Sequence, residues 1–305
     1  MKRWLTGALA ALIAGGAATA EDLRFFTLGS GELDGGYHRA ARAICSAVNR
    51  AQPGRMRCSP ETTPGSRYNI HALSRGALDL GIVQADVAAR ALTGGATGLR
   101  LAARLHEETL TVLAGPEARV ERLSDLAGRR VDIGPPASGR HATARVLFAA
   151  LGLGGGGDVA LEELPGATSV QALCDGRIDA AVFILGHPSA LVERALACGA
   201  ALAPVDGDEL ERLLAAAPYL RRTRIPVWRY AALEAPVETA ALRAELLARA
   251  ETPDEVVSAV ARALLAEAEA IGRAAPILAQ IGAGSLAENG VVPLHPGAAA
   301  VYADR

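Results

Sequence analysis

The sequence has few of the residues and spacings that nucleic-acid binding and metal binding require. Only 4% of its 305 residues are aromatic, and Lys2 is the single lysine, so the other basic residues are arginines interspersed among 33 acids. Clustered basic charge interleaved with aromatics is absent, which argues against a nucleic-acid partner. Neither C-x-x-C nor H-x-x-x-H spacing occurs, so we expect no metal ion and no cofactor.

Catalytic motifs are missing as well. The sequence contains no G-x-S-x-G elbow and no phosphate-binding loop. Its glycine-rich stretch at 152–157 follows a predicted helix, whereas a dinucleotide fingerprint lies between a strand and a helix. The sequence therefore predicts a protein that is not an enzyme. A serine hydrolase using Ser138 and His141 remains a remote alternative.

The amino terminus has the organisation of a secretory signal peptide. Lys2 and Arg3 precede an apolar run over 5–17, and Ala18-Thr19-Ala20 forms an A-x-A cleavage site. The apolar run is shorter than the roughly 20 residues of a membrane span, so an uncleaved anchor is the weaker interpretation. We expect cleavage after Ala20 and export to the periplasm. Loss of the two basic residues and no acid would take the formal net charge from −2 to −4.

Four cysteines in an exported chain favour disulfides over free or metal-binding thiols. Proximity in sequence pairs Cys45 with Cys58 and Cys174 with Cys198. On a chain-entropy model each bridge would stabilise the fold by about 3 kcal/mol.

One pattern occurs twice, a hundred positions apart, at 72–79 and 172–179: A-L-x-x-G-x-[LI]-D, followed by an apolar run. The glycine suits a helix end, and a wholly apolar strand is typical of a parallel sheet covered on both faces. The repeat predicts an α/β fold of two similar lobes, each a mainly parallel sheet flanked by helices. We place lobe I at 21–112 and 236–305 and lobe II at 113–235, with a ligand cleft between them.

Periodicity and turn residues divide the chain into elements. The predicted strands are 24–28, 57–60, 80–84, 109–114, 130–133, 159–164, 180–185 and 201–205. The principal predicted helices are 38–50, 67–75, 139–151, 207–217 and 252–272, with Thr252 as the cap of the last. The stretch 222–235 is expected to be irregular.

Two predicted helix starts carry serine beside glycine, at Gly65-Ser66 and Ser138-Gly139. Unpaired backbone N–H groups make such starts suitable for binding an anion. Plain capping by Ser66 and Ser138 is the alternative. Because the two starts occupy matching places in the two lobes, we expect both to contact the ligand.

Further candidates follow predicted strands or lie in the helices beside them. Tyr37 follows two glycines, and Asn69, Gln84 and Asp86 offer polar groups to a ligand, although each also suits a cap or surface role. Arg140 is a cation at a helix start, which opposes the helix dipole unless an anion compensates. Gly186 and His187 would close the cleft, with a structural histidine as the alternative.

An ordered set of motifs resembles the TAXI-type solute receptors of TRAP transporters. The set is Gly35-Gly36-Tyr37, Pro64-Gly65-Ser66-Arg67-Tyr68-Asn69, Val83-Gln84-Ala85-Asp86, Ser138-Gly139, Gly186-His187-Pro188-Ser189 and His295-Pro296-Gly297. The resemblance implies a periplasmic binding protein type II fold that captures an amino acid such as glutamate, or a dicarboxylate. It implies delivery to a TRAP-type membrane permease driven by an ion gradient. The four cysteines resemble those of one branch of the family.

The resemblance also implies a ligand shell, with three departures from the usual pattern. The implied shell is Tyr37, Ser66, Asn69, Gln84, Ser138 and Gly139. The departures are His38, Arg67 and Arg140, and an Arg140 that faces the cleft would favour a more acidic ligand than the family's usual one. A module that senses a ligand for a membrane kinase is the alternative function.

Overall fold

The computed structural model describes residues 23–153, 159–288 and 290–303. The predicted signal peptide with its cleavage site, and most of the glycine-rich stretch 152–157, lie outside the described residues. Within these three ranges, no helix combines the length and the apolar character that crossing a bilayer requires.

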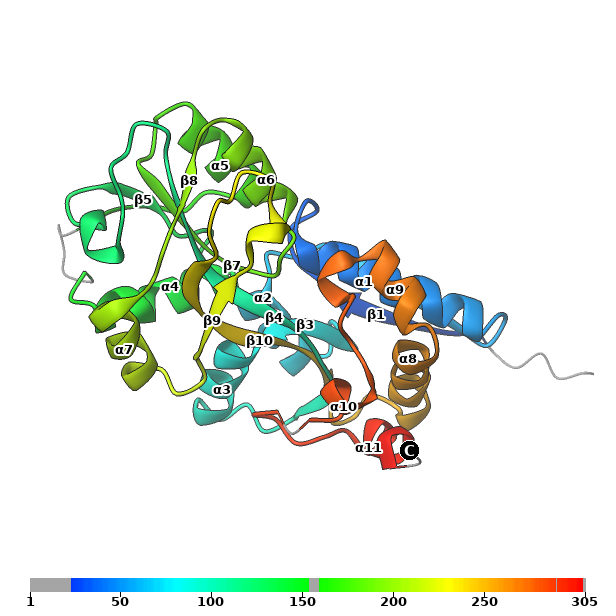
Figure 1. Ribbon diagram of the computed structural model, residues 1–305. Helices are drawn as coiled ribbons and strands as arrows, with labels where there is room; N and C mark the ends of the chain where they lie inside the picture. The colour runs from blue at the N-terminus through cyan, green and yellow to red at the C-terminus, as the bar shows by residue number, and fades with distance from the viewer. Residues whose placement is uncertain (1–22, 154–158, 289, 304–305) are drawn as a thin grey trace, which may run out of the picture.

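One mixed sheet of ten strands runs through the described residues and is flanked by helices (Figure 1). Eight strands lie in the order β2-β1-β3-β10-β4-β7-β5-β6, while β8 pairs with β4 and β9 with β10. The strands are β1 Arg24–Gly29, β2 Met56–Glu61, β3 Leu80–Gln84, β4 Leu99–Ala114, β5 Arg130–Asp132, β6 Ala160–Glu162, β7 Ala180–Leu185, β8 Ala201–Ala203, β9 Arg221–Ile225 and β10 Val237–Arg249.

The sheet has two parallel halves joined by antiparallel strands. In the first half β1 pairs in parallel with β2 and β3, and in the second half β5 pairs in parallel with β6 and β7. Strands β10 and β4 lie between the halves and run antiparallel to each other and to their neighbours β3 and β7. The expected α/β class with mainly parallel halves is confirmed, with β4 and β10 as the connection.

Helices follow most of the strands, as expected for parallel pairing. The α-helices are α1 Gly36–Ala51, α2 Ser66–Ser74, α3 Ala85–Thr93, α4 Gly139–Ala150, α5 Gly166–Cys174, α6 Ala190–Ala197, α7 Gly207–Ala216, α8 Asp254–Ala266, α9 Ala268–Ala274, α10 Ala283–Leu286 and α11 Pro296–Ala303. Short 3₁₀ turns occupy Leu123–Leu126, Val227–Arg229 and Pro276–Leu278. Helices α1, α8 and α9 pack side by side, and their alanine, valine and leucine side chains join the core of the first half.

The repeated sequence pattern has the same structure in both halves. Gly76 follows α2 with φ +73°, and Gly176 follows α5 with φ +68°, so each glycine takes the left-handed conformation that ends a helix. The aspartate after each glycine ties its strand to the parallel neighbour. Asp79 accepts hydrogen bonds from the backbone and hydroxyl of Thr27 in β1, and Asp179 accepts from the backbone and guanidinium of Arg130 in β5.

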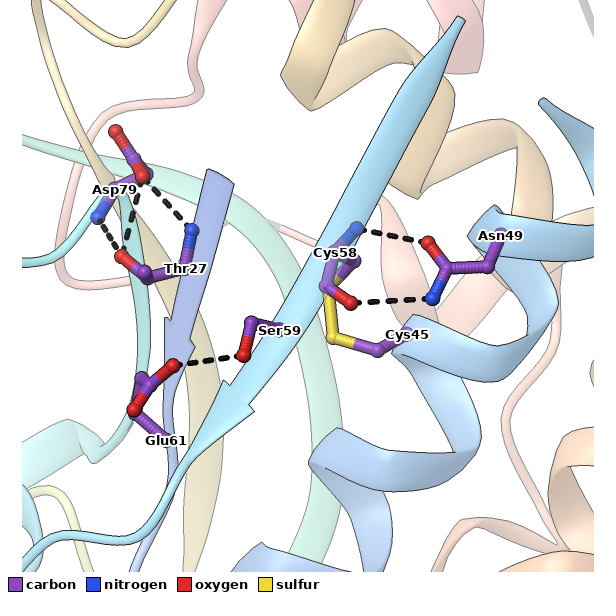
Figure 2. The surroundings of a disulfide bond; sticks show 7 residues. All are labelled: Thr27, Cys45, Asn49, Cys58, Ser59, Glu61 and Asp79. Atoms are coloured by element: carbon purple, nitrogen blue, oxygen red, sulfur yellow. Dashed lines mark hydrogen bonds between the residues drawn. A yellow bond between two sulfur atoms is a disulfide. The ribbon is translucent and has the colours of Figure 1, made fainter. Parts of the chain in front are cut away.

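Both predicted disulfides are confirmed. Cys45 in α1 bonds Cys58 in β2, and the side chain of Asn49 adds two hydrogen bonds to the Cys58 backbone (Figure 2). Cys174 at the end of α5 bonds Cys198, which follows α6. Each bridge therefore fastens a helix to a neighbouring element within its own half of the fold.

Several predicted elements are wrong in extent. The strand expected at 109–114 is the last third of the 16-residue β4, and 222–235, expected to be irregular, contributes most of β9. β10 was not predicted. Both long strands are rich in alanine, arginine and glutamate, which resemble helix composition, and tertiary pairing overrides that preference.

The long helix expected from 252 to 272 is also wrong in detail. It is interrupted at Glu267, which separates α8 from α9. Thr252 does not cap it, because its hydroxyl donates to the backbone oxygen of Asp79. Ser66 likewise is the first residue of α2 and not its cap, which is Gly65 at φ +115°.

Candidate functional site

A cavity of about 150 Å³ lies where the two halves of the fold meet. This volume is about half of the roughly 300 Å³ of the smallest drug-sized ligand pockets, so the cavity suits a small metabolite. From the first half its wall includes Glu32, Tyr37, Ser66 and Gln84; from the connecting strand β4 it includes His106 and Glu108; and from the second half it includes Ser138, Gly139, Arg140, Gly166, Phe183 and Gly186.

The two predicted helix starts lie against each other at this cavity. A Cβ added to Gly139 would lie 2.6 Å from Ser66 Oγ and 1.8 Å from Gln84 Oε1, so the close approach requires glycine at 139. The backbone N–H of Tyr68 donates to the Ala137 oxygen at 3.2 Å, which ties the start of α2 to the loop before α4. The starts of α2 and α4 therefore form one wall.

The two serines at these starts have different roles. Ser138 caps α4 as the alternative interpretation expects, because its Oγ accepts from the His141 N–H at 3.1 Å and donates to the Pro135 oxygen. Ser66 Oγ instead accepts the backbone N–H of Gln84 at 3.1 Å. Ser66 therefore fixes the end of β3 against α2 and still contributes its hydroxyl to the wall.

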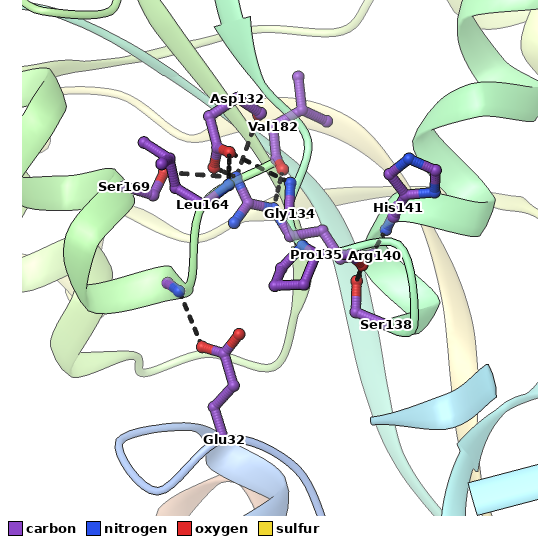
Figure 3. Close-up of polar contacts among 11 residues, drawn as sticks. Glu32, Asp132, Gly134, Pro135, Ser138, Arg140, His141, Leu164, Ser169 and Val182 are labelled. Carbon is purple, nitrogen blue, oxygen red and sulfur yellow. Dashed lines mark hydrogen bonds and ion pairs between the residues drawn. The ribbon is translucent and has the colours of Figure 1, made fainter. Parts of the chain in front are cut away.

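Arg140 lines the cavity, but a protein carboxylate already neutralises its charge (Figure 3). Its guanidinium is ion-paired with Asp132, donates to the Asp132 and Val182 backbone oxygens, and lies 3.7 Å from the centre of the Phe183 ring. Burial lowers the Arg140 pKa, and the Asp132 charge opposes that shift. Because Asp132 already pairs with Arg140, the structure gives no support to the expectation that an Arg140 facing the cleft favours a more acidic ligand.

The opposite wall carries a buried polar group that the sequence analysis missed. Tyr37 donates its hydroxyl proton to Glu108 Oε2 at 2.7 Å, and the Tyr37 ring meets the His106 ring edge-on at 5.9 Å. Glu108 and His106 lie two positions apart on β4, so both face the same side of the sheet. A histidine and a glutamate inside an otherwise buried strand are the signal that could identify His106 and Glu108. They were missed because the predicted strand begins only at Thr109, after both residues.

The environment of this wall shifts both titrating groups toward their neutral forms. Burial raises the Glu108 pKa to about 8, with a smaller contribution from the negative charge of Asp86, while the Tyr37 hydrogen bond opposes the rise. Burial also lowers the His106 pKa to about 3, helped by the positive charge of Arg243. At neutral pH Glu108 is therefore mostly the uncharged acid and His106 the uncharged imidazole.

Glu32 links the halves at a third helix start. Its Oε2 accepts the backbone N–H of Gly166, the first residue of α5, at 2.8 Å (Figure 3). Glu32 lies in the loop before α1, so this bond joins the first half of the fold to the second. A carboxylate of the protein itself thus occupies the positive end of α5.

Three predicted ligand residues lie away from the cavity wall because they bond within the protein. Asn69 donates to the backbone oxygens of Ser30 and Ile82 at 2.7 and 2.8 Å, which fastens α2 to the residue after β1 and to the middle of β3. The other two are Asp86 and His187. The sequence predicts all three as ligand contacts from their position after a strand or a helix start. Such a position fixes the element that carries a side chain but not the direction in which the side chain points.

Asp86 and His187 hold long-range contacts. Asp86 is fully buried and accepts from Arg90 and from the Thr143 hydroxyl, both at 2.6 Å, which joins α3 to α4. His187 bonds Thr109 and the Tyr230 hydroxyl through its two ring nitrogens, as the structural alternative expects. Gly186 does lie on the cavity wall.

The described residues offer no other obvious chemistry at the site. They contain no group of three or more histidine, cysteine, aspartate or glutamate side chains that could hold a metal ion. The ring of His141 pairs with Glu163, and the Ser138 hydroxyl donates its proton to a backbone oxygen. The arrangement places a few polar groups in a largely apolar lining around a small volume, which is the geometry of a binding site.

Solved structures with the same fold include a periplasmic binding protein. The periplasmic binding protein BugD aligns over 92% of both chains at 12% identity with a TM-score of 0.60. A proposed L-cystine ABC transporter of Listeria monocytogenes aligns over 84% of this chain and 95% of its own at 12% identity and a TM-score of 0.54. At such identity the likeness establishes the periplasmic binding protein type II fold alone.

The sequence itself belongs to the NMT1-like family, whose model matches residues 28–305. The match covers all the candidate residues and most of the described chain. It does not single out the TAXI-type receptors, so that finer assignment is part of the proposal below.

Proposed function

We propose that this protein is a periplasmic receptor that captures a small carboxylate for uptake, and that it catalyses no reaction. The observation that carries the proposal is the small cavity walled by the starts of α2 and α4, where the first helical residues, Ser66 and Gly139, lie against each other. Helix starts stabilise anions without a side-chain cation. Family membership and the periplasmic binding protein fold support a transport role.

Capture would follow the closure of two lobes. We propose lobe I at 21–112 with 236–305, and lobe II at 113–235, so that the chain crosses between them within β4 and just before β10. Contacts that bridge the proposed lobes favour the closed form, among them Glu32 with Gly166 and Asp86 with Thr143. A ligand that touches both walls would add to these contacts and shift the population further toward closure.

The membrane partner we propose is a TRAP-type permease, on the strength of the motif resemblance. Export would use the amino-terminal signal peptide, cleaved after Ala20. Uptake of ligand by membrane vesicles holding receptor and permease should then require an ion gradient and no ATP. Uptake that requires ATP would contradict the TRAP assignment and favour an ABC partner, the class named for one structural neighbour.

The central experiment identifies what the receptor holds. Native mass spectrometry of the purified protein should detect a co-purified ligand, and thermal shifts across amino acids and carboxylic acids should find compounds that stabilise it. A ligand at a hundredfold above its dissociation constant adds about 2.7 kcal/mol of stability. Absence of any stabilising or co-purifying carboxylate, with the protein folded, would contradict the proposal.

A further inference from the structure

The charges on the cavity wall do not suit a ligand with two negative charges. Glu32 and Glu108 both lie on the wall, and Arg140 is already paired with Asp132. Among the described wall residues the remaining arginine is Arg39, whose side chain is exposed to solvent at the edge. A dicarboxylate would therefore bring two charges beside two protein carboxyl groups without a buried cation to neutralise them.

The Glu108 end of the cavity contains buried polar atoms without partners. Both ring nitrogens of His106 and both amide atoms of Gln84 make no hydrogen bond with the described residues. His106 Nε2 lies 3.8 Å from Glu108 Oε1, too far for a hydrogen bond, and these residues are at most 5% exposed. Gln84 Oε1 and one His106 ring nitrogen are acceptors, and leaving them unpaired costs free energy, so a ligand that brings hydrogen-bond donors would satisfy them.

The two ends of the cavity are close together. Tyr37 donates to Glu108 at 2.7 Å. Burial raises the Tyr37 pKa, and hydrogen bonding with Ser66, on the helix-start wall, opposes that rise. The Tyr37 side chain alone thus separates Glu108 from the helix starts at which an anion would bind. Opposite groups on a single small ligand, a few bonds apart, would reach both.

These observations deepen the proposed function, on which the next step rests. We infer that the ligand is a small amino acid without net charge, whose carboxylate lies at the starts of α2 and α4 and whose ammonium is received by Glu108. An ammonium carries three N–H donors, enough for Glu108, Gln84 and the acceptor nitrogen of His106. Glu108 is then the residue that separates amino acids from plain carboxylates and dicarboxylates.

Binding of an ammonium would also release a proton. In the empty site burial keeps Glu108 mostly protonated at neutral pH, and the groups facing it are Tyr37, His106 and, at longer range, Asp86. An ammonium beside the carboxyl favours the ionised form, so the acid O–H bond breaks and its proton passes to solvent. One proton leaves for each ligand bound, and the ion pair that forms has no net charge.

Matched ligand pairs test the inference on the wild-type protein. Isothermal titration at pH 7 compares each net-neutral amino acid with the same acid lacking the amino group, such as L-alanine with propionate, and L-aspartate with succinate as a charged pair. For the amino acid that binds, we expect at least tenfold tighter binding than for its partner, and weaker binding of every dicarboxylate. Titration in phosphate and in Tris should show close to one proton released.

The variant Glu108→Gln keeps the shape of the side chain but cannot become a carboxylate. It should lose at least tenfold in affinity for the amino acid, little for the plain acid, and the proton release. Glu107→Gln is the matched control, because Glu107 is the adjacent residue on β4 and pairs with Arg221 away from the cavity. The control should bind as the wild type does, and Glu108→Asp, which retains a carboxyl, should retain the preference for amino acids.

Two outcomes separate failure of this inference from failure of the proposed function. If a plain carboxylate or dicarboxylate binds as tightly as its amino counterpart and no proton is released, Glu108 does not bind an ammonium group. The proposed receptor function would then still stand. If the co-purified ligand is not a carboxylate at all, the proposed function itself is wrong.

Discussion

The two halves of the sheet are built alike and yet contribute differently to the cavity. Each half has the helix–glycine–aspartate–strand unit, and each aspartate ties its strand to the parallel neighbour. Both halves bring a helix start to the wall; the second half adds an arginine already paired with Asp132, whereas the first half adds the Tyr37 phenol, which bonds Glu108 of the connecting strand β4. Shared architecture therefore does not imply shared chemistry, because the unit sets the scaffold and single buried positions set the site.

The sharpest contrast between the halves concerns their buried aspartates. In the second half Asp132 is fully buried and its partner Arg140 is only 9% exposed; in the first, Asp86 is fully buried but Arg90 is 37% exposed. Asp132→Asn leaves a buried cation without its counterion and should lower the free energy of unfolding by about 3–5 kcal/mol. Asp86→Asn should cost less, about 1–3 kcal/mol, because water can solvate Arg90. Urea denaturation measures both, and equal losses would contradict the difference.

The disulfides should behave nearly alike in the two halves. Replacing Cys45 and Cys58 by alanine removes a bridge across 13 positions, and replacing Cys174 and Cys198 removes one across 24. Chain entropy predicts a loss of about 3 kcal/mol for each pair, with the longer loop costing about 0.5 kcal/mol more. Chemical denaturation of the two double variants checks this, and a loss confined to one half would show that the other folds without its bridge.

Above neutral pH, the free energy of unfolding should depend on the buried Glu108 of β4. Folded Glu108 keeps its proton up to about pH 8, whereas the unfolded chain loses it near 4.5, so this group's contribution to stability falls as pH rises through that window. From pH 7 to 8 the loss is about 1 kcal/mol. Glu108→Gln should flatten this part of the profile, and the difference between the two proteins isolates Glu108 from Glu245, whose pKa burial raises to about 7.

Acid pH should affect both regions in the same direction. Burial lowers the pKa of His106 and of His187 to about 3, so below pH 6.5 the unfolded state binds protons that the folded state does not, and stability falls with pH. Replacing either histidine by glutamine should reduce that fall by a similar amount, measured by thermal unfolding from pH 7 to 4. A profile changed only by His187→Gln would show that His106 takes up its proton in the folded protein.

The smallest predicted difference concerns the two matching glycines. Alanine at Gly76 or Gly176 must adopt a left-handed backbone, which costs about 1–2 kcal/mol. A Cβ at Gly76 would also lie 2.9 Å from Arg249 Nη1, while at Gly176 no atom of the described residues beyond its chain neighbours lies within 4 Å. Gly76→Ala should therefore be slightly the more destabilising, because the flexible arginine must move; the reverse order in thermal unfolding would contradict this account.

Local signals predicted most of the scaffold from sequence. The A-L-x-x-G-x-[LI]-D unit identified two strands and their helices, and proximity identified both disulfides. The long strand β10 was missed because V-E-T-A-A-L-R-A-E-L-L-A-R has the composition of a helix, and only pairing with β3 and β4 makes it a strand. Non-local pairing of this kind leaves no mark in a short window of sequence.

The site was harder to predict for a similar reason. Positions after strands correctly indicated which loops meet, and Tyr37, Ser66, Gln84, Ser138, Gly139, Arg140 and Gly186 do lie on the cavity wall. Asn69, Asp86 and His187 have the same local context, but partners far away in sequence turn them into the protein interior. Glu108 lies within a long strand, where its distance from any turn or glycine hid it.

Because β10 lies between β3 and β4, the centre of the sheet is the last part of it to be synthesised. A nascent chain that has reached residue 236 still lacks the strand that joins its two parallel halves. In such a chain the facing edges of β3 and β4 have no partner strand until roughly four-fifths of the sequence has emerged. Truncations that remove β10 should consequently leave an aggregation-prone product, because the facing edges of β3 and β4 would have no partner strand.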